Sequence, residues 1–182
     1  MINSYTTKVF PVSRIGNEKS PKLIILLCNP GGDPKYYKRL AEYPMDKDGF
    51  YKSSGMDLHI YREYCEWWDK VLNKTDKHGI KDKDILALEY YPYHTKCSND
   101  SKHWEWDTFA QKSLSKNKEL LLKHIRNGVP VFGYYYGFWL NDKDINKQLS
   151  MLKPMQFYKS RNGLGQSLKL KDLDDWLHKT RK

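Results

Sequence analysis

Long hydrophobic runs are missing from this 182-residue sequence. No stretch approaches the ~20 apolar residues that a membrane-spanning helix needs. The N-terminal segment also lacks the positive-then-apolar order of a secretory signal peptide. We therefore expect a cytoplasmic protein that has no membrane partner.

Cysteine is scarce, with three residues scattered along the chain and no C-x-x-C pair. Such an odd, dispersed set does not build a disulfide framework, so reduced thiols are expected. His94 and Cys97 form an H-x-x-C pair, but a structural zinc site usually takes four close ligands in recognisable pairs. We therefore expect no metal site.

Several common motifs are absent as well. The sequence contains no G-x-x-x-x-G-K-[ST], G-x-G-x-x-G, G-x-S-x-G or H-E-x-x-H pattern. These absences argue against a nucleotide hydrolase, a dinucleotide-binding enzyme, a serine hydrolase and a zinc protease. No cofactor is expected.

Positive charge is abundant, with a formal net charge of +10 and a pI near 9.3. A basic surface gains affinity for nucleic acid by releasing counterions from phosphates, so DNA is the leading expected partner. The alternative is that the surplus of lysine only keeps the protein soluble. The length and the 39% of hydrophobic residues fit one folded domain, residues 1–182.

Short apolar runs alternate with stretches of helical periodicity. The runs predict strands at 22–28, 85–91 and 129–135, with a weaker fourth at 155–159. Apolar residues recur at helical spacing between the first two strands, behind Ser53-Ser54. They are Met56, Ile60, Tyr61, Tyr64, Trp68, Val71 and Leu72.

Two further helices complete the alternation. One lies between the second and third strands and ends at Asn127-Gly128. The other follows the fourth strand, and we expect Asp172, Asp174 and Asp175 at its start, where a helix dipole favours acidic residues. The order predicts an α/β fold, a three-layer α/β/α sandwich with a mainly parallel central sheet of about four strands.

Ligands of such sheets bind outside the carboxyl ends of the strands, so the segments that follow the strands should converge. The first is Asn29-Pro30-Gly31-Gly32-Asp33. The Asn29 amide can orient a water molecule or hold a base edge, and the Pro-Gly-Gly turn lets the backbone approach a ligand. Asp33 is a candidate general base. An ordinary turn, with Asp33 capping a helix, is the alternative.

The second strand ends in a polar, aromatic segment. Glu89 lies inside an apolar run, so we expect a lysine, an arginine or a backbone donor to pair with it. His94 can supply a proton near neutral pH, and Tyr93 can stack on a planar ligand. Lys96 adds a candidate contact to nucleic acid.

The fourth strand leads into Lys159, Ser160, Arg161 and Asn162, a set suited to gripping a phosphate. A solvated basic loop is the competing interpretation. The third loop is rich in aromatic residues, which favour either a stacking surface or a packed core.

The hydrophobic strand that runs into Asn29-Pro30-Gly31, together with the three later strands and their loops, resembles the uracil-DNA glycosylase superfamily, in particular the branch with Asn-Pro-Gly in its first motif. Residues 89–95 also resemble a segment of uncharacterised bacterial and phage proteins. The resemblance implies hydrolysis of an N-glycosidic bond after a base has been flipped out. Asn29 would hold the water, and Tyr36, Tyr37 or Phe50 would stack on the base.

The sequence departs from that family after the fourth strand, where SRNGLGQSLK replaces a histidine-containing loop. Either His94 assists the departing base, or the domain binds nucleic acid without cutting it. A third hypothesis is an enzyme that acts on a small nucleoside or nucleotide.

Overall fold

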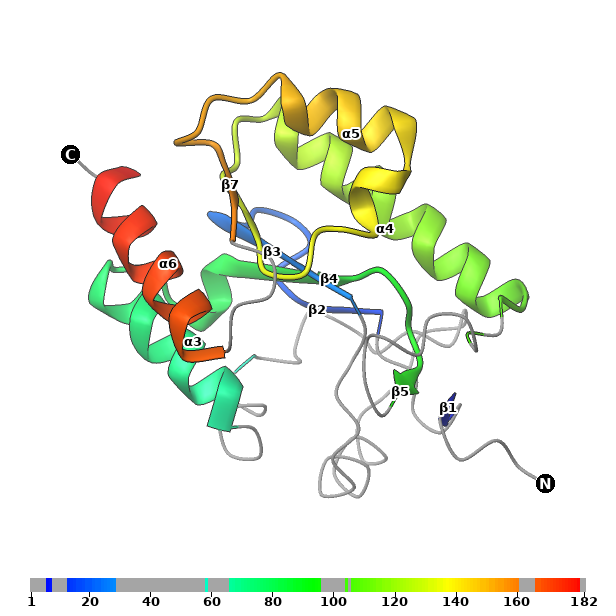
Figure 1. The fold of residues 1–182 in the computed structure, drawn as a ribbon, viewed down its shortest axis with the longest axis horizontal. Helices are drawn as coiled ribbons and strands as arrows, with labels where there is room; N and C mark the ends of the chain where they lie inside the picture. Colours follow the sequence, from blue (N-terminus) through cyan, green and yellow to red (C-terminus); the bar gives the residue numbers. More distant parts are fainter. Residues whose placement is uncertain are drawn as a thin grey trace.

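A computed structural model describes residues 6–7, 13–28, 58, 66–95, 104, 106–160 and 166–180. Its main sheet has five strands in the spatial order β2-β4-β3-β6-β7 (Figure 1). The strands are β2 (Arg14–Gly16), β3 (Leu23–Leu27), β4 (Ile85–Glu89), β6 (Val131–Gly133) and β7 (Phe157–Lys159). All neighbours are parallel except β2, which pairs antiparallel with β4. The mainly parallel sheet is confirmed, with one more strand than expected.

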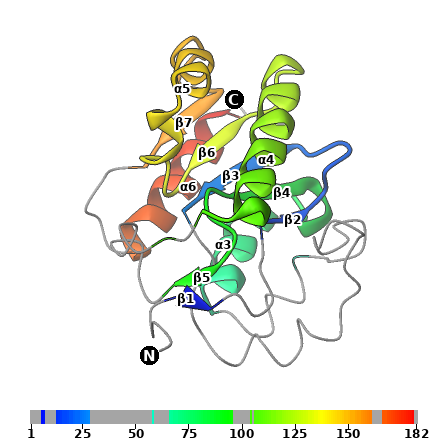
Figure 2. The same ribbon diagram turned by 90° about the vertical axis from the view of Figure 1, so that its right-hand side faces the viewer.

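The helices lie on both faces of this sheet. They are α3 (Glu66–Lys77), α4 (Thr108–Arg126), α5 (Lys143–Ser150) and α6 (Gln166–Thr180). Figures 1 and 2 show α3 and α6 on one face and α4 and α5 on the other. The expected α/β sandwich is therefore confirmed.

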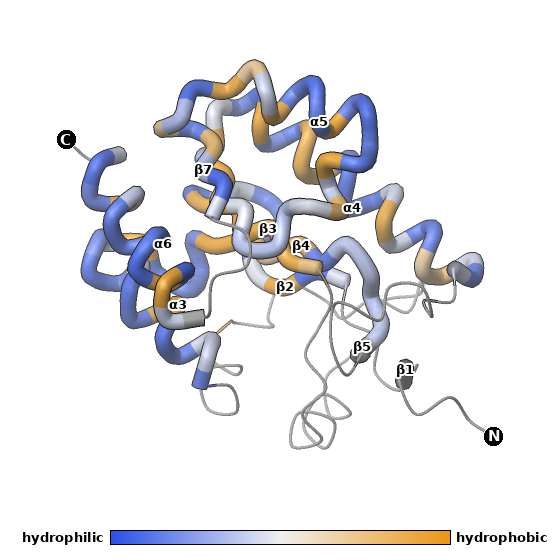
Figure 3. Tube along the Cα trace, in the orientation of Figure 1, coloured by the Kyte–Doolittle hydropathy of each residue, from blue (hydrophilic) through white to orange (hydrophobic). Residues whose placement is uncertain are grey.

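The central strand β3 explains why its sequence is apolar throughout. Ile25 and Leu27 pack into the core on the α3 and α6 side, whereas Ile24 and Leu26 pack into the core on the α4 and α5 side. Successive side chains of a strand point to opposite faces, so a strand covered on both faces needs apolar residues at every position. Figure 3 shows the hydrophobic centre and the hydrophilic outer surfaces of the helices.

The ends of α4 follow local rules. The Asp107 carboxylate accepts a hydrogen bond from the Ala110 backbone N–H at 2.9 Å, which caps the first turn. The helix stops at Asn127-Gly128, where Gly128 has a φ of +76°. The glycine stop expected from the sequence is confirmed.

The acidic start expected for the last helix is wrong. Helix α6 begins at Gln166 and has no acidic residue in its first turn, so the aspartates lie further along it. Asp172 is buried, and Asp174 pairs with Lys74 Nζ at 2.7 Å and His78 Nε2 at 2.8 Å. Asp174 therefore forms ion pairs between α6 and the α3 segment, and it does not lie at the start of the helix, where it would interact with the helix dipole.

Several elements were not predicted. Strand β2 and helix α5 are short, and β2 carries a buried arginine, Arg14. Gly16 has a φ of +94°, and a Cβ there would lie 2.2 Å from the Ile85 carbonyl oxygen, so only glycine fits this close approach. The remaining elements are β1 (Thr6–Thr7), β5 (His94–Thr95) and the 3₁₀ turns η1 (Asp82–Asp84) and η3 (Trp139–Asn141).

Strands β1 and β5 form a separate antiparallel pair in which Thr7 lies opposite His94. This pair is separate from the five-stranded sheet. Among the described helices, none combines the length and the apolar character needed to cross a membrane.

Candidate functional site

The order of the parallel strands defines a switch point. Among the parallel strands, β3 comes first in the chain and lies between the second, β4, and the third, β6, and the chain then continues outward to β7. The connections after β3 and β6 thus lead in opposite directions. In sheets of this kind the crevice at the carboxyl ends of such strands is the usual ligand site.

The β6 chain bends across the end of β3 at this point. The backbone N–H groups of Tyr134 and Tyr135 both donate to the Leu26 carbonyl oxygen, at 3.1 and 3.0 Å. The Trp139 indole N–H donates to the Leu27 carbonyl oxygen at 2.7 Å. These bonds hold the start of the third loop against the first strand.

The β4 chain fixes the other side of β3. The backbone N–H of Tyr90 donates to the Leu27 carbonyl at 3.2 Å, and that of Tyr91 donates to the Cys28 carbonyl at 2.8 Å. Cys28 is therefore anchored to the end of β4. It directly precedes Asn29 in the sequence, which lies outside the described part of the chain.

Most of the residues expected in the site lie outside the described part of the chain. They are Asn29, Pro30, Gly31, Gly32, Asp33, Tyr36, Tyr37, Phe50, Lys96, Arg161 and Asn162. Their roles stay predictions. The first two of these segments follow β3 and β4. These two strands are adjacent and parallel, as expected.

Glu89 is buried at the end of β4, with 4% of its surface exposed. It is in register with Leu27, so its side chain projects to the face covered by α3 and α6. The expected partner is not found: among the described residues, no group donates a hydrogen bond to its Oε2. Burial raises the pKa of Glu89 well above its ordinary value, which favours the protonated form.

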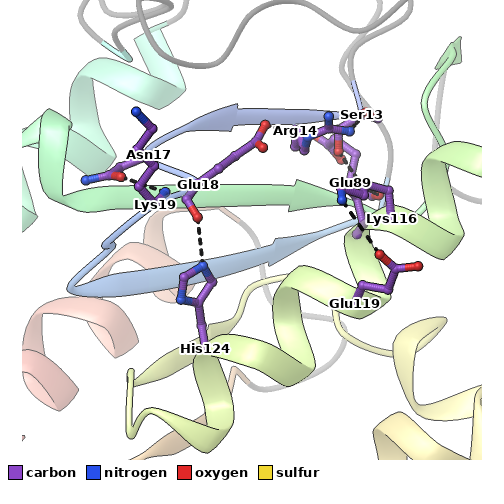
Figure 4. Close-up of polar contacts among 10 residues, drawn as sticks. Ser13, Arg14, Asn17, Glu18, Lys19, Glu89, Lys116, Glu119 and His124 are labelled. Carbon is purple, nitrogen blue, oxygen red and sulfur yellow. Dashed lines mark hydrogen bonds and ion pairs between the residues drawn. The ribbon is translucent and has the colours of Figure 1, made fainter. Parts of the chain in front are cut away.

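The backbone of Glu89 is held tightly although its carboxyl group is not. Its N–H donates to the Ser13 carbonyl at 2.9 Å. The Asn117 amide of α4 donates to the carbonyls of Ser13 and Glu89, at 2.7 and 2.9 Å. Figure 4 shows Ser13, Arg14 and Glu89 together at this end of the β2–β4 pair. The sheet edge thus holds the backbone of Glu89 in place.

Lys169 of α6 is a second buried ionisable group, only 4% exposed. Its Nζ donates to the Tyr134 carbonyl at 2.9 Å and lies 3.7 Å from the centre of the Tyr135 ring. Burial lowers the pKa of Lys169, whereas the neighbouring Asp172 carboxylate raises it. The residue lies at the switch point next to Tyr135, which is 38% exposed. Sequence analysis missed it because it lies among exposed lysines on a helix.

The Cys28 thiol lies near both of these groups. Burial raises its pKa, the neighbouring Glu89 raises it further, and Lys169 lowers it. The thiol is therefore held in its protonated form, which is a poor nucleophile. Cys28 therefore helps to locate the site, and its thiol does not serve as a nucleophile.

Two buried polar atoms near Lys169 interact with each other. Burial raises the pKa of the Tyr134 hydroxyl, and its interaction with the Trp67 indole N–H lowers that pKa. Their rings meet edge to face with centres 4.9 Å apart. No further described group completes the hydrogen bonding of these two atoms.

An aromatic cluster fills the opposite side of Cys28. Tyr91 stacks on Trp104 with ring centres 4.5 Å apart, and Tyr93 packs against Tyr91 at 5.5 Å. Tyr93 is only 4% exposed, and its hydroxyl donates to the Asp107 carboxylate at 2.7 Å. This packing leaves no ring face for a ligand, so the expected stacking role of Tyr93 is corrected to a structural one.

The fourth loop also differs from expectation. The Ser160 side chain is buried, and its hydroxyl donates to the Tyr134 carbonyl at 3.0 Å. Its expected phosphate contact is therefore corrected to an internal one. Lys159 is exposed, with its ammonium 5.7 Å from the centre of the Phe157 ring, and remains accessible to a ligand.

Comparisons with protein-family models, curated proteins and solved structures found no match to this chain. In the described segments, no group of three or more histidine, cysteine or acidic side chains is arranged to hold a metal ion. The described part of the site thus consists of a buried glutamate, a buried lysine and a partly exposed aromatic ring near Cys28. Such groups can bind a planar ligand, donate hydrogen bonds to it and exclude water.

Proposed function

We propose that this chain is a glycosylase-like protein that binds DNA and hydrolyses the N-glycosidic bond of a flipped-out base of the uracil type. The observation that carries the proposal is the position of Cys28. This residue is anchored at the switch point by the Tyr91 N–H, and Asn29 follows it directly. A water-holding amide would then emerge where an α/β sheet commonly binds its ligand.

The reaction needs three things from the protein. A water molecule must be held beneath the sugar, the base must be stacked, and negative charge on the departing base must be stabilised. In our proposal Asn29 holds the water, Asp33 accepts its proton and His94 assists departure of the base. The exposed ring of Tyr135 adds a stacking surface to those proposed for Tyr36, Tyr37 and Phe50.

DNA binding rests on the net charge and on the exposed end of β7. Lys159 and Arg161 would contact phosphates, as would Lys96 and Asn162. A net charge of +10 supports such a partner. Because the Ser160 side chain points inward, fewer side chains are available to contact phosphates than the sequence indicates.

That internal role of Ser160 also favours a second candidate, an enzyme that acts on a free nucleoside or nucleotide. Buried Glu89 and Lys169 suit a small ligand that is enclosed by the protein. Turnover of free nucleosides that does not change when Lys159 and Arg161 are neutralised would favour this candidate over the first.

The test uses oligonucleotides that contain uracil or another modified base, followed by alkali to break abasic sites. We expect strand cleavage by the wild-type protein and a loss of at least ~100-fold in Asn29→Ala, because a misplaced water slows attack on the sugar. Asn146→Ala, an exposed change on α5, is the matched control and should cleave like the wild type. Salt-sensitive DNA binding without cleavage of any substrate would instead indicate a non-catalytic module.

A further inference from the structure

The outer face of α4, which lies lengthwise in Figure 2, carries basic residues at helical spacing. Lys112, Lys116, Lys123 and Arg126 are all exposed and follow one another at intervals of four, seven and three residues. At about 100° per residue, these intervals confine the four side chains to an arc of about 80°. They therefore form one stripe, which is about 21 Å long because an α-helix rises about 1.5 Å per residue. We call these four residues the α4 stripe.

Most of the charge of the α4 stripe is not balanced within the described structure. Glu119 is the single acidic residue of α4, and its carboxylate lies 3.7 Å from Lys116 Nζ. The other three members of the stripe form no ion pair with a described residue. Lys118 differs from them, because it is half-buried and pairs with Asp142, the cap of α5, at 2.5 Å. The basic residues of the stripe thus stay available to a partner, whereas Lys118 holds two helices together.

The helices on the opposite face of the sheet have a different charge pattern. On α3, Lys70 pairs with Glu66 at 2.5 Å, and Lys74 pairs with Asp174 of α6 at 2.7 Å. Helix α6 itself contains three aspartates. Solubility alone does not require basic residues to gather on one face of a protein, whereas a polyanionic partner does. The one-sided surplus on α4 therefore favours such a partner.

An exposed aromatic ring lies beside the first turns of α4. The Gln111 side chain donates a hydrogen bond to the Trp106 carbonyl at 2.9 Å, which places Trp106 next to the start of the stripe. Trp106 is 36% exposed, and its ring meets that of Tyr90 edge to face with centres 5.8 Å apart. Tyr90 directly follows β4, so the stripe starts at the same edge of the sheet as the candidate site. Proteins that bind single-stranded nucleic acid commonly combine a basic track with a ring on which a base can stack.

We propose that the α4 stripe and Trp106 bind single-stranded DNA, with the stripe contacting phosphates of the strand and the Trp106 indole stacking on an unpaired base. The single strand follows from Trp106, because a ring can stack only on a base whose face is not already covered by its neighbours. The inference rests on the proposed function for its partner, DNA. It adds a surface separate from Lys159 and Arg161, and it does not require that any base is removed.

Fluorescence anisotropy over a salt series tests the stripe. The probe is a labelled oligothymidine of about 20 nucleotides, which exceeds the usual length of such a binding site and contains no uracil. The double variant Lys112→Gln/Lys123→Gln is compared with Lys77→Gln/Lys171→Gln, which removes two exposed lysines from the opposite face and leaves the same net charge. We expect the slope of log Kd against log salt concentration to fall by about 1.4 in the first variant, or about 0.7 for each lost phosphate contact, and to change much less in the control. Equal changes in the two double variants, or no binding by the wild type, would overturn the proposal.

The same assay tests the stacking role of Trp106. Trp106→Ala should weaken binding ~10-fold without changing the salt slope, and Trp106→Phe, which keeps a ring, should restore most of the affinity. Urea unfolding checks that both variants remain folded. The wild type should bind the single strand more tightly than the matching duplex or polyglutamate, and equal affinity for any two of these partners would refute the assignment. If the wild type binds as expected but cleaves no modified oligonucleotide, the glycosylase function fails and the single-strand surface stands.

Discussion

Replacing Glu89 with glutamine isolates the effect of one buried carboxyl group on stability. The ordinary pKa of the side chain is 4.5, and burial raises it in the native protein. Below pH 4.5 the carboxyl is protonated in both states, so pH has no effect through this group. Above it the unfolded chain releases the proton while the native protein keeps it, and unfolding becomes easier as the pH rises.

The size of the effect follows from this linkage. Between the unfolded and the native pKa, each pH unit lowers the free energy of unfolding by up to about 1.4 kcal/mol. Glutamine does not titrate, so its free energy of unfolding does not change with pH through this position. Relative to the wild type, Glu89→Gln should therefore become more stable by the same amount per pH unit. The added amide needs its own partners, but that contribution does not change with pH.

Urea unfolding between pH 4 and pH 8 measures this difference directly. Glu119→Gln serves as the control, since Glu119 is 68% exposed on α4 and should follow the wild-type profile. Parallel profiles for Glu89→Gln and the wild type would show that the native carboxyl keeps its ordinary pKa. Such a result would refute the description of Glu89 as a buried, protonated acid.

Three further predictions concern the supports of the site and its partner. Asn117→Ala removes two buried hydrogen bonds and should lower the free energy of unfolding by about 2–4 kcal/mol, measured by urea unfolding, whereas Asn146→Ala should change it little. Asp107→Ala removes the α4 cap and the acceptor for Tyr93, and should lower it by about 2 kcal/mol; a change too small to measure would contradict the cap. Neutralising Lys159 and Arg161 together should weaken DNA binding and reduce its salt dependence by about one unit of slope per lost phosphate contact; unchanged binding across a salt series would rule out their role.

The strands that could be predicted from the sequence are those with continuous apolar runs. Leu23–Leu27 is buried at every position, so its sequence carries the pattern of a central strand, and Gly128 marks the end of α4. Strand β2 was missed because three residues that include a buried arginine carry no pattern. The start of α6 was misplaced because Asp174 serves a contact with α3 rather than the helix dipole.

The position that we propose for the site follows from the sequence, whereas the described residues around it could not be predicted. The rule that ligands bind at the carboxyl ends of strands led to the segment after Cys28. Lys169 was missed because its burial depends on how α6 packs near Tyr134, which no local pattern encodes. Tyr93 and Ser160 looked accessible in the sequence, yet the fold turns both side chains inward.

The position of a bound base tests the central proposal most directly. A crystal structure with an oligonucleotide that carries a non-hydrolysable uracil nucleotide would locate it. We expect the base at the carboxyl ends of β3 and β6, against Tyr135, with the sugar beside Asn29. A base bound elsewhere on the protein, with that crevice closed by packed side chains, would contradict the proposal.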